Sequence, residues 1–340
     1  MSVPDFSNHI IHQYKLVQRL QERPLTTLYL GQDTRLDQPL FVEVMNQPAA
    51  ENEELAGRFQ RRLETVRQLD HPHIAPILQV GRANLTSSES GQQVAKAEPQ
   101  HLYAIIDYIA GPTLAQQIET WRETGDWPDV PARLSLVRDL ASALTAAHPV
   151  GLFHHDLRPA NLIMGENGRL TFIDLGVPTA PGVPTAPNAT DPQQLPAQLD
   201  YTSPEQLEGK VPTGPSNIYS LGIILYELLA GHRPHLPGSA WDIFERTDLP
   251  REIPLPIACP GLTDATYRVV KTCLWRQYWN RYETADHLVN ALDAAHTAEE
   301  KAHSDSTTLR KRKLPPRYWR YAGVALLLLL LLIGTIWLIL

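Results

Sequence analysis

The sequence predicts an α+β protein with two lobes, a small β-rich lobe and a larger helical lobe, followed by one C-terminal transmembrane helix. Three observations lead to this prediction. Short apolar runs separated by polar turns fill the first third of the chain, helical periodicity follows, and the last nineteen residues carry no charge. The predicted parts are the small lobe (residues 10–110), the large lobe (111–294), a linker with a basic juxtamembrane segment (295–320) and the transmembrane helix (321–340).

Length, charge and cysteine content restrict the class of protein. The 340 residues are 43% hydrophobic, which is enough to bury one two-lobed domain or two ordinary domains. The net charge of -7 argues against wholesale binding to nucleic acid, because phosphates require a basic face. Cys259 and Cys273 have no metal-ligand spacing, so neither a disulfide framework nor a zinc site is indicated.

The small lobe is predicted to be a meander of strands with one helix. Apolar runs alternate with polar turns in residues 14–45, as is typical of strands. Residues 51–69 have apolar side chains at helical spacing, which indicates an amphipathic helix. Two further strands are predicted at residues 74–80 and 102–109, and the polar residues 82–100 between them are expected to form an exposed hairpin insertion.

The large lobe is predicted to be mainly helical. Helical patterns are clearest at residues 114–122, 132–148, 216–230 and 265–275. Residues 176–201 are rich in proline and contain Gly-Val-Pro-Thr-Ala-Pro twice. Because proline removes backbone donors and favours extended conformations, we expect a flexible loop there.

The C-terminal residues predict a membrane anchor. At 1.5 Å per residue, the charge-free stretch 322–340 reaches roughly 30 Å, the thickness of a hydrocarbon core. Basic and aromatic residues precede it: Arg310, Lys311, Arg312, Lys313, Arg317, Tyr318, Trp319 and Arg320. We expect a single-pass protein of the cell (inner) membrane that is bound to membrane lipid through this helix. Its lobes should lie in the cytoplasm, because basic flanks stay on the cytoplasmic side and the N-terminus has no signal-peptide pattern. The alternative for residues 322–340 is a buried helix of a soluble protein, and the alternative for the basic residues is a solvated run of charges.

Oxygen-bearing side chains on two tight loops carry the chemistry of the large lobe. The sequence HHDLRPAN at residues 154–161 is followed by DLG at residues 174–176, so that Asp174 comes thirteen residues after Asn161. Phosphoryl transfer from a nucleotide needs a carboxylate that takes the proton of the attacking hydroxyl, and hard oxygen ligands for Mg²⁺. This spacing supplies both.

These motifs, together with Ser203-Pro204-Glu205 and Arg281, resemble the protein kinase superfamily, and most closely the Ser/Thr protein kinases of bacteria. The resemblance covers roughly residues 14–292. It implies the two-lobed protein-kinase-like fold, with Mg-ATP as the cofactor if the protein is active.

The resemblance also implies a role for each polar residue of the two loops. Asp156 looks like the catalytic base, and Arg158 stands where the family has a lysine that contacts phosphate. Asn161 and Asp174 look like the Mg²⁺ ligands. Asn161 is also counted among the catalytic residues, and Asp174 among the residues that bind the cofactor. For each of these residues the alternative is a capped turn.

Further positions are implied for adenine binding and for stability. Ile106, Asp107 and Tyr108 should lie at the hinge that receives adenine. Glu205 and Arg281 resemble the buried structural ion pair of the family.

The small lobe departs from the family pattern. Where the family has a glycine-rich loop, residues 21–26 read QERPLT, and glycine matters there because backbone amides must approach phosphates closely. Glu43 takes the place of the phosphate-binding lysine, and Arg62 takes the place of the helix glutamate that pairs with it. We therefore expect a reversed Glu43–Arg62 salt bridge, with two unrelated surface charges as the alternative. Arg23 is a candidate replacement cation, although an arginine in a turn is more often solvated.

Three further departures lie in the large lobe. His155 replaces the arginine that receives an activation-loop phosphate in many family members, and Gln198 falls where a threonine usually contacts the catalytic site. Asn217 replaces the helix aspartate that braces the catalytic loop in the family, so that a weaker brace is expected. Together these departures favour a membrane-anchored pseudokinase, a cytoplasmic signalling or docking module with a degenerate ATP site and weak or no phosphotransfer. An active ATP-dependent Ser/Thr protein kinase and a nucleotide sensor without transfer are the alternatives. The partner or substrate would be a cytoplasmic protein.

Overall fold

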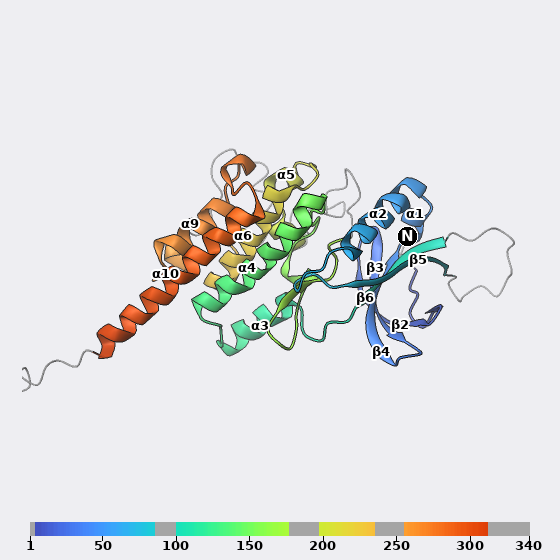
Figure 1. The fold of residues 1–340 in the computed structure, drawn as a ribbon, viewed down its shortest axis with the longest axis horizontal. Helices are drawn as coiled ribbons and strands as arrows, with labels where there is room; N and C mark the ends of the chain where they lie inside the picture. Colours follow the sequence, from blue (N-terminus) through green and yellow to red (C-terminus); the bar gives the residue numbers. More distant parts are fainter. Residues whose placement is uncertain (1–3, 86–99, 177–196, 235–254, 312–340) are drawn as a thin grey trace, which may run out of the picture.

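The computed structural model describes residues 4–85, 100–176, 197–234 and 255–311. A β-rich small lobe and a helical large lobe lie side by side along the long axis of the molecule (Figure 1). Most of the predicted proline-rich loop, most of the hairpin insertion and the predicted transmembrane helix lie outside the described residues. The described end of the loop, Ala197–Tyr201, forms a 3₁₀ turn. Within the described ranges, no helix has the length and apolar character needed to cross a membrane.

The small lobe is built on one antiparallel sheet with two helices. Its elements are β1 (Ile10–Ile11), β2 (Tyr14–Glu22), β3 (Thr26–Asp33), β4 (Gln38–Met45), α1 (Gln47–Ala50), α2 (Glu53–Arg67), β5 (Ile77–Asn84) and β6 (Gln100–Asp107). The sheet order is β1-β2-β3-β4-β6-β5. The sheet places the turn between β2 and β3 beside β4, because Thr26 pairs with Met45 and Leu28 with Glu43.

Both faces of this sheet are covered. On one face, α2 buries Ala56, Phe59, Leu63 and Val66, and Asn52 caps its first turn by accepting hydrogen bonds from the amides of residues 54 and 55. On the other face, the N-terminal segment packs a second apolar cluster. That cluster consists of Phe6, Ile11, Tyr14, Leu16, Tyr29, Leu40, Val42, Val44, Leu85, Tyr103 and Ile105. The N-terminal residues thus belong to the core of the small lobe.

The large lobe is helical except for one short hairpin. Its helices and strands are α3 (Leu114–Thr124), α4 (Val130–Ala147), β7 (Leu162–Met164), β8 (Leu170–Phe172), α5 (Pro204–Leu207), α6 (Gly214–Ala230), α8 (Leu255–Ala258), α9 (Asp264–Cys273) and α10 (Ala285–Lys311). Short 3₁₀ turns lie at His148–Val150, Pro159–Asn161, Ala197–Tyr201 and Tyr278–Asn280. The four predicted helices correspond to α3, α4, α6 and α9.

Helix α6 is the centre of the large lobe. From Ser216 to Leu229 every side chain is buried, so this helix is enclosed on all sides. Gly222 is required for the close packing of α9, since a Cβ atom there would lie 2.5 Å from the Cβ of Cys273.

Helix α10 continues beyond the predicted end of the large lobe. The sequence places the linker from residue 295, but α10 is helical to Lys311 and its Ala295 side chain is fully buried. Glu299 explains this continuation. Its carboxylate accepts hydrogen bonds from the Thr263 amide (2.8 Å) and from the hydroxyls of Thr263 (2.8 Å) and Thr266 (2.5 Å) at the start of α9.

Replacing Glu299 with alanine is expected to lower the free energy of unfolding by about 1–3 kcal/mol, because a part-buried amide and two hydroxyls lose their acceptor. Urea denaturation of the variant measures this loss. Glu300→Ala, at the exposed neighbouring position, is the control, and an equal loss in both variants would contradict the role of Glu299.

Candidate functional site

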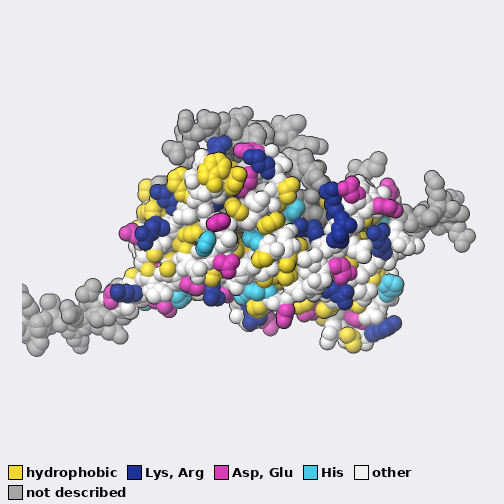
Figure 2. Space-filling view, turned by 45° about the horizontal axis from the view of Figure 1, so that its top comes forward, with side chains coloured by type: hydrophobic (Ala, Val, Ile, Leu, Met, Phe, Trp, Pro, Cys, Tyr) yellow, Lys and Arg dark blue, Asp and Glu magenta, His cyan; other side chains and the backbone are white. Residues whose placement is uncertain are grey.

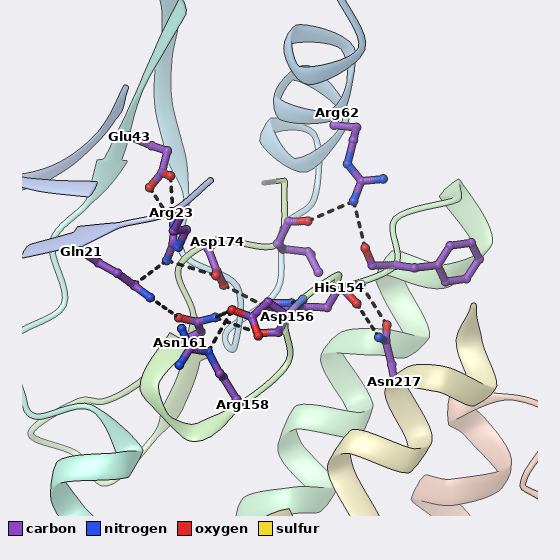
Figure 3. A network of polar contacts seen from close by, with 12 residues as sticks. Gln21, Arg23, Glu43, Arg62, His154, Asp156, Arg158, Asn161, Asp174 and Asn217 are labelled. Carbon is purple, nitrogen blue, oxygen red and sulfur yellow. Dashed lines mark hydrogen bonds and ion pairs between the residues drawn. The ribbon is translucent and has the colours of Figure 1, made fainter. Parts of the chain in front are cut away.

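The predicted catalytic residues meet at the junction of the two lobes (Figure 3). The loop before the Pro159–Asn161 turn carries Asp156 and Arg158, and Asp174 follows β8. Asp156 Oδ2 accepts hydrogen bonds from Arg158 Nε (2.9 Å) and from Asn161 Nδ2 (3.1 Å), and Asn161 Nδ2 also donates to the Asp156 carbonyl (2.7 Å). The three residues predicted for the catalytic loop are therefore held in one cluster.

Asp174 is buried, and both of its carboxylate oxygens are engaged. Oδ1 accepts from Nε2 of His154 at 2.8 Å, and Oδ2 lies 3.2 Å from Nη2 of Arg23. The other ring nitrogen of His154 accepts the amide hydrogen of Asp156 at 3.2 Å, which fixes Nε2 as the donor. Burial pushes the pKa of Asp174 up, but His154 and Arg23 outweigh it and lower that pKa below its usual value.

Arg23 connects this cluster to the small lobe. Its Nη1 donates to both carboxylate oxygens of Glu43 at 2.9 Å, and its Nη2 donates to Oε1 of Gln21 at 2.9 Å. The side chain of Arg23 is only 8% exposed and that of Glu43 is fully buried. Burial lowers the pKa of the Arg23 guanidinium, but Glu43 and Asp174 outweigh it and raise that pKa, so Arg23 is a permanent cation.

Gln21 closes the contacts into a ring. Its Nε2 donates to Oδ1 of Asn161 at 3.2 Å. A continuous path of polar contacts thus runs through six residues, by their side chains and the backbone amide of Asp156, and returns to its start. These are Arg23, Gln21, Asn161, Asp156, His154 and Asp174, which we call the interlobe ring.

The predicted Glu43–Arg62 salt bridge is wrong. Glu43 pairs with Arg23, while Arg62 Nη2 donates to the backbone carbonyls of Phe153 (2.9 Å) and Leu175 (3.4 Å). The tight turn between β2 and β3 is the reason. The Arg23 amide donates to the Thr26 carbonyl and Asn46 Nδ2 donates to the Arg23 carbonyl, which directs the arginine under the sheet instead of into solvent.

The residues predicted for the hinge lie where β6 leaves the sheet. Ile106 is buried, and the Tyr108 amide donates to Oδ1 of Asp107 at 3.0 Å. The ring of Tyr108 packs against Phe41 with centroids 5.0 Å apart. Gly111 follows with a φ of 149°, and a Cβ atom there would lie 1.9 Å from the Met164 carbonyl oxygen, so the connection between the lobes needs glycine. Adenine binding at these residues stays a prediction.

Asn217 on α6 still braces the catalytic loop. Its Oδ1 accepts from the His154 amide at 2.9 Å and its Nδ2 donates to the His154 carbonyl at 2.7 Å. Its Oδ1 is also 3.1 Å from Nε2 of His148. An amide can both donate and accept, so this substitution retains a two-sided brace.

The Glu205–Arg281 ion pair is present and buried. Arg281 donates from Nη1 and Nη2 to the two carboxylate oxygens of Glu205 at 2.8 and 2.9 Å, and Ser216 Oγ donates to the same carboxylate at 2.7 Å. The guanidinium also lies over the ring of Tyr219, 4.8 Å from its centroid. Burial pushes the pKa of Glu205 up, but Arg281 and Ser216 outweigh it and lower that pKa.

This geometry and the motif order define a protein kinase domain, and the chain belongs to the protein kinase family, whose domain it matches over residues 27–289. It is 27% identical over 289 residues to the serine/threonine-protein kinase PrkC of Bacillus subtilis, covering 84% of this chain and 41% of that protein. It is 26% identical over 292 residues to PknB of Mycolicibacterium smegmatis, covering 86% and 44%. The chain thus spans less than half the length of these curated relatives.

Solved structures agree on the fold. The kinase domain of Mycobacterium tuberculosis PknI superposes with a TM-score of 0.60 at 22% identity, covering 85% of this chain and 98% of that chain. The predicted resemblance to bacterial Ser/Thr kinases and the predicted two-lobed fold are therefore confirmed.

The interlobe ring decides how the site fits Mg-ATP. The oxygens that would hold Mg²⁺ are Asn161 Oδ1 and the two of Asp174, and all three are bonded to Gln21, His154 or Arg23. In this arrangement the residues fit Mg²⁺ poorly, because the Arg23 cation already lies beside Asp174 and each of the three oxygens already accepts one contact. Sequence reasoning missed Gln21 and His154. His154 could have been found from its position two residues before Asp156, whereas nothing in the sequence singles out Gln21.

Proposed function

We propose that this chain is a signalling or docking module with a protein kinase fold. In this proposal Arg23 occupies the part of the nucleotide site where phosphate and metal would bind. Mg-ATP therefore binds weakly, and phosphotransfer is weak or absent. The observation that carries the proposal is the position of Arg23 between two buried carboxylates, Glu43 and Asp174. Arg23 neutralises Asp174, the carboxylate that a metal ion would otherwise neutralise.

The energy of breaking these pairs supports the proposal. Removing one partner from a buried ion pair costs about 3–5 kcal/mol, because a charge is left without compensation. At about 1.4 kcal/mol for each factor of ten, this cost weakens nucleotide binding by roughly a hundred-fold to a few thousand-fold, unless the ligand restores the lost contacts.

Thermal melting of the full chain tests the proposal. We expect no rise in melting temperature with ATP, with Mg²⁺ or with both at millimolar concentration, and no transfer of labelled phosphate to a generic protein substrate. Asp156→Asn supplies the background for the transfer assay. Stabilisation by Mg-ATP without transfer would instead indicate a nucleotide sensor, and transfer that Asp156→Asn abolishes would contradict the proposal.

An active kinase is the second candidate, and one observation favours it. Asp156, Arg158 and Asn161 are assembled around one carboxylate. If Arg23 turned from Glu43 towards a bound phosphate, it would supply the cation that Glu43 cannot. In that case Arg23→Ala abolishes transfer, whereas under the first proposal it has no transfer to abolish.

We also propose that residues 321–340 anchor the protein in the inner membrane with the kinase fold in the cytoplasm. The charge-free stretch and the basic residues before it support this. Deleting residues 322–340 should move the protein from the membrane fraction to the soluble fraction. Recovery of the complete chain in the soluble fraction without detergent would contradict the anchor.

A further inference from the structure

Three aromatic side chains lie exposed between α9 and α10. They are Trp275, Tyr278 and Trp279, which we call the aromatic turn, and their exposed fractions are 43%, 44% and 70%. No other Phe, Tyr or Trp side chain within the described ranges is exposed to this extent. Figure 2 shows an apolar patch near the top of the large lobe, bordered by basic and acidic side chains. An exposed patch of this kind is typical of an interaction site.

Buried contacts hold the aromatic turn in one shape. Arg281 Nε donates to the Trp275 carbonyl at 2.7 Å, and the Arg281 amide donates to the Tyr278 carbonyl at 3.2 Å. The buried ion pair with Glu205 fixes Arg281 in turn. The rings of Tyr278 and Trp279 meet edge to face, with centroids 5.0 Å apart. A ligand therefore meets aromatic side chains that are already in place, which reduces the entropy lost on binding.

The surroundings of the aromatic turn favour an uncharged ligand. Gln277 and Asn280, which are exposed on the same turn, carry no charge. Glu208 and, more weakly, Tyr278 raise the pKa of Lys210, so this lysine lies near the turn, but Glu208 pairs with it at 2.7 Å. Indole N–H and phenol O–H groups donate hydrogen bonds. This chemistry fits an apolar peptide whose backbone carbonyls are free to accept.

The chain itself contains such a peptide. Proline recurs at every third position, at 178, 181, 184 and 187, and a valine or an alanine precedes each of these prolines. A polyproline II helix has three residues per turn, so in that conformation the two sets form two adjacent apolar stripes. Its backbone has no internal hydrogen bonds, which leaves the carbonyls free for aromatic donors. Residues 177–190 also carry no charge.

The proline-rich residues are long enough to reach the aromatic turn. The 3₁₀ turn Ala197–Tyr201 and the four residues after it place Ala197 at most about 25 Å from Glu205. Glu205 binds Arg281, which adjoins the aromatic turn. Ala197 comes ten residues after Pro187, a stretch of about 30 Å in the polyproline II conformation. The repeats can therefore lie against the exposed rings.

We propose that the aromatic turn is a docking site for the proline-rich segment of the same chain, residues 177–196, which binds there as a polyproline II helix. The proline stripe packs against the rings of Tyr278 and Trp279, and the indole and phenol groups donate to carbonyls of the segment. Neither Arg23 nor the interlobe ring takes part, so this contact is independent of the proposed function.

Peptide binding to the full-length protein in detergent tests the contact. In the test protein, a Gly-Ser segment of equal length replaces residues 177–190, and fluorescence anisotropy follows the binding of a labelled peptide with the sequence of those residues. We expect saturable binding. The wild type should bind the peptide at least about ten-fold more weakly, because its own segment competes at an effective concentration in the millimolar range. No saturable binding to the test protein, or equal binding to both proteins, would overturn the proposal.

Matched variants of the test protein locate the site. Trp279→Ala should weaken peptide binding by about thirty-fold, the loss that is typical of an aromatic hot spot. Leu36→Ala is the control, since Leu36 is 66% exposed on the small lobe, and it should leave binding unchanged. A peptide of the same composition whose prolines are not three residues apart should bind at least about ten-fold more weakly. Equal effects of the two substitutions, or equal binding of the two peptides, would contradict the docking site.

Sedimentation of the wild-type protein distinguishes the same chain from a second copy. For an intramolecular contact, the wild type and Trp279→Ala should sediment alike at every protein concentration. A dimer of the wild type that Trp279→Ala dissociates would assign the contact to the segment of a second copy and would overturn the intramolecular contact.

Discussion

Replacing Arg23 with alanine is expected to lower the free energy of unfolding by about 3–5 kcal/mol, because it leaves the buried carboxylates of Glu43 and Asp174 without their cation. Urea denaturation followed by circular dichroism measures the loss. Arg19→Ala is the matched control: Arg19 lies on β2, just before Arg23 in the sequence, its pair with Glu22 is exposed, and its loss should cost less than about 1 kcal/mol.

The double variant Arg23→Met with Glu43→Leu sharpens the test. It removes Arg23 and Glu43 and fills the space with apolar side chains, while Asp174 keeps its contact with His154, so it should recover most of the stability that Arg23→Met alone loses. The two changes are then non-additive. If Arg23→Ala loses no more than Arg19→Ala, or if the two changes add, the ion pair does not stabilise the small lobe.

Replacing Arg281 with alanine is expected to have an effect of similar size, about 3–5 kcal/mol, since it leaves Glu205 buried without its bidentate partner. The same change removes the contact with the Tyr219 ring and the donors to the carbonyls of Trp275, Pro215 and Arg276. Thermal or urea denaturation measures the loss. Arg138→Ala, which breaks an exposed pair between α4 and α10, should cost only about 0–1 kcal/mol.

The Glu205 pair also predicts how stability depends on pH. The pKa of Glu205 is lower in the folded protein than the value of 4.5 for the free side chain. A carboxyl group of this kind contributes stability above its unfolded pKa, and the contribution is lost as the pH falls through the folded pKa. Stability should therefore decline below about pH 4.5, and Glu205→Gln should flatten the decline. An unchanged acid profile in that variant would count against this assignment.

The large-lobe site could be predicted because its residues are close in the sequence. Asp156, Arg158 and Asn161 lie within six residues, so one loop and one 3₁₀ turn fix their contacts. Glu205 and Arg281 are far apart, but the family resemblance placed them correctly.

The small-lobe contacts could not be predicted in the same way. Whether Glu43 meets Arg62 or Arg23 depends on the direction of each side chain, and the sequence gives only the spacing. The turn at residues 23–26 folds under the sheet because Asn46 and Thr26 hold its backbone, and the position of Asn46 beside the turn depends on the pairing of β3 with β4. The expectation that Arg23 is solvated failed for this reason.

The interlobe ring has a consequence for the motion of the two lobes. Separating them requires the contacts Gln21–Asn161 and Arg23–Asp174 to break together, along with the hydrogen bonds of Arg62 to the loops. Hinge bending on the microsecond to millisecond timescale should therefore be rare, and amide hydrogen exchange near β2 should be slow. A partner that docked across both lobes would therefore meet a pre-organised surface, and little conformational entropy would be lost on association.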